Sequence, residues 1–140
     1  MIIRISETEK LQNDPAYQEF VRNHPGTGFL KIRASSAGEA IPIEGVKITV
    51  SKEIGDNTII FFEGITDDSG MINGIKLPTP ERIQSDEEVP RFAAYDLHAV
   101  YEKQNFDKLY NISLCCGFGI IQYINITPDV ESEMRDYNGN

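Results

Sequence analysis

The sequence has few of the features that mark disulfide-rich or membrane-spanning proteins. Its 140 residues include only two cysteines, Cys115 and Cys116, and neighbouring residues rarely reach good disulfide geometry. A secreted disulfide scaffold is therefore excluded, and reduced thiols are the default. No apolar run approaches the ~18 residues that a membrane helix needs, nor does one of signal-peptide length follow the amino terminus. We expect no membrane insertion.

Basic residues are also scarce. Thirteen Lys and Arg stand against 22 Asp and Glu, which gives a net charge of -9. A field of this sign repels phosphate backbones and anionic lipid, so nucleic acid is not expected as a partner. The remaining composition, 40% hydrophobic and 25% charged, is that of a globular chain long enough to bury one core.

Motifs that carry catalytic or metal chemistry are missing. The chain contains no Gly-x-Ser-x-Gly, phosphate-cradling glycine loop, Cys-x-x-Cys or His-x-x-x-His. The stretch 67–70, Asp-Asp-Ser-Gly, is too short for a calcium loop and predicts a turn with positive φ at Gly70. We therefore predict no catalytic residue, no cofactor and no metal site.

The isolated nucleophiles and bases have ordinary structural explanations. His24 lies in a Pro-Gly turn, and His98 shares a strand face with Asp96, which favours a surface hydrogen bond over a catalytic pair. Cys115 and Cys116 lie in an apolar strand region, where one thiol is expected to point to the core and the other outward.

One helix is predicted near the amino terminus. Asp14 provides a cap residue before Pro15, and Tyr17, Phe20 and Val21 follow at helical spacing. The helix should end by residue 23, because a His-Pro-Gly sequence follows.

The rest of the chain has the twofold period of β-strands. Alternating or β-branched runs predict seven strands, at residues 30–35, 46–51, 58–62, 71–77, 95–102, 109–116 and 118–127. Gly117 and Gly119 mark a bulge or bend between the last two runs. The proline-framed segment 78–90, with its acidic stretch 85–88, reads as an exposed loop. The fold class expected is all-β, a seven-stranded antiparallel β-sandwich with one short N-terminal helix.

Three segments follow from this pattern. Residues 1–27 form an N-terminal segment with the helix, 28–128 form the sandwich, and 129–140 form an acidic tail or the start of a linker.

Several motifs resemble a known sandwich family. The segments 42–50, 66–70 and 95–100 look like the carboxypeptidase-regulatory-like, transthyretin-like sandwich, although Asn105-Phe106 stands where Gly-Tyr is usual. The segments 20–32, 77–80 and 125–128 are similar to small clostridial-type proteins, and related sandwiches are appended to spore cortex-lytic and other peptidoglycan-associated proteins. The resemblance implies a non-catalytic bacterial module, cytoplasmic or spore-associated, because no export signal is seen.

Two further hypotheses concern covalent and carbohydrate chemistry. Related bacterial sandwiches join a strand Lys to an Asn beside a buried acid, and Lys31, Asn125 and Glu102 occupy loosely comparable strands, although alternation turns Lys31 toward solvent. Aromatic side chains suited to a sugar platform are Phe61, Phe62, Tyr95, Tyr101, Phe118 and Tyr123. Most should fill the core, with Phe62 and Tyr123 outward.

The expected function is that of a non-catalytic structural or binding module near the bacterial envelope or spore cortex. Its partner would be peptidoglycan or a protein. The alternative is an assembly protein that forms homo- or hetero-oligomers through sheet edges, as in a phage tail or spore component. A small hydrolase that uses His98 with a Cys or Asp has the least support.

Overall fold

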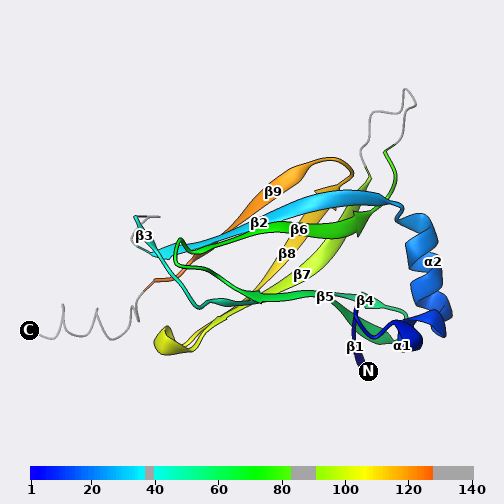
Figure 1. The fold of residues 1–140 in the computed structure, drawn as a ribbon, viewed down its shortest axis with the longest axis horizontal. Helices are drawn as coiled ribbons and strands as arrows, with labels where there is room; N and C mark the ends of the chain where they lie inside the picture. Colours follow the sequence, from blue (N-terminus) through cyan, green and yellow to red (C-terminus); the bar gives the residue numbers. More distant parts are fainter. Residues whose placement is uncertain (37–39, 83–90, 128–140) are drawn as a thin grey trace, which may run out of the picture.

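Two β-sheets face each other in the computed structural model, which describes residues 1–36, 40–82 and 91–127. The first sheet has the order β1-β5-β4-β7-β8. In the second, β2 is central and pairs with β6, with β9 and, at its end, with β3. Figure 1 shows α2 covering one end of the sandwich, where it spans the gap between the two layers. The strands are β1 (Ile2–Arg4), β2 (Gly26–Ser36), β3 (Ile41–Pro42), β4 (Lys47–Ile54), β5 (Asn57–Ile65), β6 (Met71–Thr79), β7 (Phe92–Tyr101), β8 (Phe106–Cys115) and β9 (Gly119–Asn125).

The core lies between the sheets and is built from alternate strand residues. Leu30, Ile32 and Ala34 of β2 are buried, as are Tyr95 and Leu97 of β7. This is the pattern of sheets with one buried face, in which the intervening residues meet solvent.

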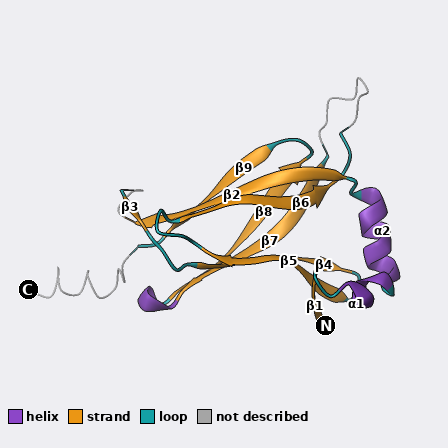
Figure 2. Ribbon diagram, in the orientation of Figure 1, coloured by secondary structure: helices purple, strands orange, loops and turns teal. Residues whose placement is uncertain are grey.

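The helix α2 forms where the local sequence caps it. In α2 (Pro15–Asn23), the Asp14 carboxylate accepts hydrogen bonds from the amides of Ala16 and Tyr17, at 3.1 and 3.4 Å. The buried Phe20 ring then packs against Phe61, with ring centroids 5.8 Å apart. Figure 2 shows α2 and the shorter α1 (Thr8–Gln12) at the same end of the sandwich, and η1 (Glu102–Gln104) at the other. The predicted helix is confirmed, and α1 was not predicted.

The all-β sandwich is confirmed, but the predicted strand number is wrong. All seven predicted strands form, and two more, β1 and β3, raise the number among the described residues to nine. These two strands have three and two residues, too few to show a period. The description as purely antiparallel is also wrong, because β1 pairs with β5, and β2 with β9, in parallel.

The predicted turns at two glycines are present. Gly70 has a φ of +74°, and the Asp67 carboxylate accepts hydrogen bonds from the amides of Ser69 and Met71. Gly117, with a φ of +81°, lies where the chain leaves β8 in one sheet and enters β9 in the other. The exposed loop predicted at 78–90 is wrong at its start, because Pro78 and Thr79 belong to β6 and Thr79 is buried. Residues 83–90, with the acidic stretch, and the predicted tail from 129 lie outside the described residues.

Candidate functional site

Charge is distributed unevenly between the two sheets. None of β2, β6 and β9 contains an aspartate or glutamate, although the chain has 22 acidic residues. The same three strands carry the cations Lys31, Arg33 and Lys76. This sheet therefore presents positive charge on a molecule whose net charge is -9.

These cations lie on the solvent side of the sheet together with apolar side chains. Because Leu30 and Ile32 are buried, alternation turns the residues between and beside them outward. In the register of β2 with β9, Lys31 lies beside Ile121 and Arg33 beside Tyr123. We call this surface the outer face; its members are Lys31, Arg33, Lys76, Phe29 (40% exposed), Ile121 (48%) and Tyr123 (43%).

A shallow hollow of about 320 Å³ opens on the outer face. Small residues leave this space: Gly119 lies beside Phe29 in the register, and a Cβ built on Gly74 would meet no atom within 4 Å. Lys31 and Ile121 also line the hollow. A ligand lying along β2 would thus contact aromatic, aliphatic and cationic side chains one after another. Sequence reasoning did not find this surface, because six of the seven predicted strands lack acidic residues and the sequence alone does not single out these three.

The opposite sheet carries acidic residues as well as exposed apolar side chains, among them Ile65, Phe92 and Leu109. His98 Nε2 lies 2.6 Å from the Asp107 carboxylate, and the two side chains are 41% and 69% exposed. The neighbour predicted from the sequence, Asp96, instead accepts a hydrogen bond from Asn111 at 3.4 Å. The cross-strand register of β7 and β8 decides these partners, which one strand alone cannot reveal. The result is the surface hydrogen bond that we expected for His98, made with a different acid.

The other candidate nucleophiles and bases are dispersed. In the register of β7 with β8, Phe92 lies beside Cys115 and His98 beside Leu109, so Cys115 is six positions, roughly 20 Å, from His98. Both cysteines are free and half-buried. Cys115 and His98 are therefore too far apart to form a catalytic pair.

His24 has a structural role at the end of α2. Its ring stacks on Phe20 with centroids 3.9 Å apart, and its Nδ1 lies 2.7 Å from the Phe20 carbonyl oxygen. Burial lowers the pKa of His24, and the nearby Lys52 ammonium lowers it further. The imidazole therefore stays neutral to a lower pH than it would in a free peptide.

The residues of the proposed covalent cross-link are not brought together. Lys31 lies beside Ile121, whereas Asn125 lies beside Ser35, four positions or roughly 13 Å farther along the strands. Glu102 belongs to η1. The prediction of a Lys–Asn–Glu constellation is wrong in its geometry.

The aromatic residues divide as predicted, with two exceptions: Phe62, and Phe118, which was expected in the core but is 53% exposed. Tyr95 is buried, and Phe61 packs edge-on against it with centroids 5.2 Å apart. Tyr123 faces outward, as predicted. Phe62 does not, because it lies beside the buried Val50 and packs against the core.

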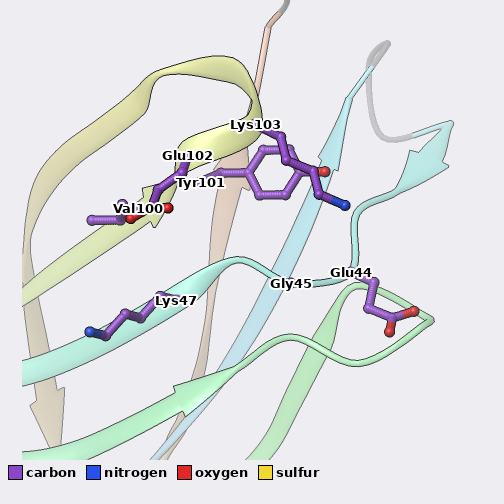
Figure 3. A pocket seen from close by; sticks show the side chains of 7 residues that line it. All are labelled: Glu44, Gly45, Lys47, Val100, Tyr101, Glu102 and Lys103. Carbon is purple, nitrogen blue, oxygen red and sulfur yellow. The ribbon is translucent and has the colours of Figure 1, made fainter.

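A second recess lies at the end of the sandwich away from α2. Figure 3 shows Tyr101 and Lys103 on one side of it and Glu44, Gly45 and Lys47 on the facing segment. Its volume is about 320 Å³. Among the described residues, no group of three or more His, Cys, Asp or Glu side chains is placed to hold a metal ion. No helix in residues 1–36, 40–82 and 91–127 is long and apolar enough to cross a membrane.

Comparison with known proteins finds solved structures of similar fold but no match to a sequence family. No family model matches the chain, and no curated protein does. Among solved structures, (S)-allantoin synthase is similar with a TM-score of 0.51 and 12% identity, over 80% of this chain and 44% of that one. The chain thus spans less than half of that protein, and the likeness concerns the fold alone.

Two further solved structures are similar at lower scores. They are Klebsiella pneumoniae 5-hydroxyisourate hydrolase (TM-score 0.48, 18% identity, 72% of this chain and 85% of that one) and Sparus aurata transthyretin (0.41, 15%, 69% and 90%). At these identities the two enzymes do not decide whether this chain is catalytic.

Proposed function

We propose that this chain is a non-catalytic binding module that holds an anionic glycan of the bacterial envelope, such as peptidoglycan with its attached polymers, on the outer face. The observation that carries the proposal is the absence of acidic residues from β2, β6 and β9, together with the exposed Phe29, Ile121 and Tyr123. Aromatic faces suit sugar rings, and the three cations suit carboxylate or phosphate groups on the same polymer.

The net charge of -9 is compatible with such a ligand. Charges separated by more than ~8 Å are largely screened at physiological ionic strength. A polymer on the outer face would be governed by Lys31, Arg33 and Lys76, whereas acids such as Glu63, Asp96 and Asp107 belong to the opposite sheet. The three cations of the outer face therefore act on a bound polymer more strongly than the net charge of the whole chain does.

Co-sedimentation with insoluble peptidoglycan from a spore-forming bacterium tests the proposal. We expect the chain to pellet at low and at physiological salt, with weaker pelleting at the higher salt. Tyr123→Ala should reduce pelleting at both salts, and Lys31→Gln with Arg33→Gln should reduce it mainly at low salt, because these changes remove stacking and charge separately.

The matched control lies on the opposite sheet. Lys108 and Leu109 of β8 are exposed, so Lys108→Gln with Leu109→Ala removes a cation and an apolar side chain elsewhere. Pelleting of this control should equal that of the unchanged protein. If the unchanged protein stays in the supernatant at both salts, or if the control loses binding equally, the proposal is wrong.

Self-assembly through a sheet edge is the second candidate. Within the described part of the chain, β9 pairs with β2 alone, so its other edge offers unpaired backbone groups next to the exposed Ile121 and Tyr123. Sedimentation equilibrium over a wide concentration range tests it. A mass that rises with concentration and falls back in Tyr123→Lys favours assembly, whereas a monomer throughout rejects it.

A further inference from the structure

The recess at the end of the sandwich is built around the ring of Tyr101. This half-buried residue ends β7 and borders two adjoining hollows of about 320 and 550 Å³. Both hollows are also lined by Glu44, Gly45 and Lys103. In Figure 3 the Tyr101 ring and Lys103 face the segment that carries Gly45. The aromatic ring therefore forms a wall that a ligand can reach from either hollow.

The rim that faces Tyr101 is fixed by a buried threonine. The Thr66 hydroxyl donates to the Ile43 carbonyl at 2.8 Å and accepts from the Val46 amide at 3.0 Å. The Gly45 amide donates to the Thr66 carbonyl at 3.1 Å. Gly45 has a φ of +91°, and a Cβ built on it would lie 3.9 Å from the Tyr101 ring. These bonds hold bare backbone opposite the ring.

The second rim is closed by a short helical turn. The Asn105 residue that ends η1 has a φ of +51°, and its amide donates to the Glu102 carbonyl at 3.1 Å. Phe106 then pairs with Tyr101 at the start of β8. Both rims of the recess are thus held by backbone hydrogen bonds, which lowers the ordering cost of binding.

The charged groups around the recess are balanced. Glu44 and Glu102 contribute two carboxylates, Lys47 and Lys103 two ammonium groups, and none of the four has an ion-pair partner in the described residues. This set favours neither an anion nor a cation. It suits a neutral ligand rich in hydroxyl groups, because a hydroxyl donates to a carboxylate and accepts from an ammonium group.

We propose that this recess binds one end of a neutral pyranose oligosaccharide, with a sugar ring against the face of Tyr101 and its hydroxyls on Glu44, Glu102 and Lys103. The combination of an aromatic wall, polar groups along the lining and a volume of several hundred Å³ is that of a small-ligand site. The site is separate from the outer face, which has cations without acids, so the two are tested independently.

A titration followed by ¹H–¹⁵N NMR tests this site with three probes: chitotriose, cellotriose and maltotriose. At least one should shift the amide signals of Gly45, Glu102 and Lys103 in a saturable manner. Tyr101→Ala should weaken that binding at least about tenfold, because it removes the stacking surface. Tyr101→Phe keeps the ring and should bind within about twofold of the unchanged protein, because the Tyr101 hydroxyl makes no hydrogen bond within the described structure.

Lys103→Met tests the site without removing the ring. It keeps most of the side-chain length but loses the donor, and binding should weaken about threefold or more. Lys108→Met, on β8, is the matched control and should bind unchanged. The proposal is overturned if none of the three probes shifts these amides, if the shifts map to β2 and β9 instead, or if folded Tyr101→Ala and Lys103→Met both bind as tightly as the unchanged protein.

Discussion

Gly70 and Ala34 meet backbone to backbone. The Ala34 amide donates to the Gly70 carbonyl at 2.7 Å, and a Cβ built on Gly70 would collide with the Ala34 carbonyl oxygen. Gly70 also has a φ of +74°, a conformation that residues with a side chain rarely adopt. This contact holds the turn after β5 against β2, the central strand of the other sheet.

Gly70→Ala should destabilise the protein by at least about 3 kcal/mol. The new methyl group adds a clash with fixed backbone to the cost of a left-handed conformation. Gly74→Ala is the control, because Gly74 has the same φ of +74° but no atom within 4 Å of its Cβ position. It should cost only about 1 kcal/mol. Urea unfolding measures both, and equal losses would show that the Ala34 contact contributes nothing.

Two buried threonines should respond oppositely to the loss of their hydroxyl groups. Thr66→Val leaves the Ile43 carbonyl and the Val46 amide without their partner and should cost about 2–3 kcal/mol. The Thr79 hydroxyl is buried and has no hydrogen-bond partner among the described residues. Thr79→Val should therefore be neutral or stabilise by up to about 1 kcal/mol.

Thermal and urea unfolding of the two valine variants decide this comparison. Thr66→Ser keeps the hydroxyl and should recover most of the stability lost in Thr66→Val. A clear destabilisation by Thr79→Val would mean that its hydroxyl has a partner in solution, and an unaffected Thr66→Val would contradict the account of the rim opposite Tyr101.

His24 should make stability depend on pH near neutrality. Burial and Lys52 lower its folded pKa below the ordinary 6.5, so the unfolded chain binds the proton more strongly. Stability should then fall as the pH drops from about 6.5 toward the lower folded pKa, and should gain nothing from His24 above that window. His24→Phe keeps a ring against Phe20 and removes the titrating group.

Urea midpoints between pH 5 and 8 measure the effect. On acidification below about pH 6.5, the unchanged protein should lose more stability than His24→Phe does. Above neutrality, the stability of the two proteins should depend on pH in the same way. His98→Gln serves as the control for the other histidine, which lies on the opposite sheet beside Asp107. Identical pH profiles for the unchanged protein and His24→Phe would contradict this assignment.

The sequence predicts those parts of the fold whose signals are local. Asp14 and Pro15 mark the start of α2, and alternation across Leu30, Ile32 and Ala34 marks β2. The parallel pairing of β2 with β9 is not local, because two strands far apart in the chain must be aligned before it exists. The short strands β1 and β3 depend on the same tertiary pairing and carry no period of their own.

In the candidate sites, too, the sequence predicts what is local and not what depends on strand pairing. The partner of His98 was misjudged because Asp107 belongs to the next strand, and the register of β7 with β8 sets which acid lies within reach. Tyr101 was recognised as an aromatic candidate. Its position opposite Gly45, however, depends on the hydrogen bonds between Thr66 and the segment before β4. Sequence indicates which side chains have suitable chemistry, and cross-strand register decides which of them meet.

The register of β2 with β9 also predicts the covalent state of Lys31. Lys31 and Asn125 lie four positions apart, so their side chains cannot form the amide bond considered from the sequence. The intact mass should equal the sequence mass without loss of an ammonia, and trypsin should cleave the unfolded chain after Lys31 as readily as after Arg33. Lys31→Ala should change the mass only by the substitution. A mass lower by one ammonia, restored in Lys31→Ala, would show that the strands pair differently.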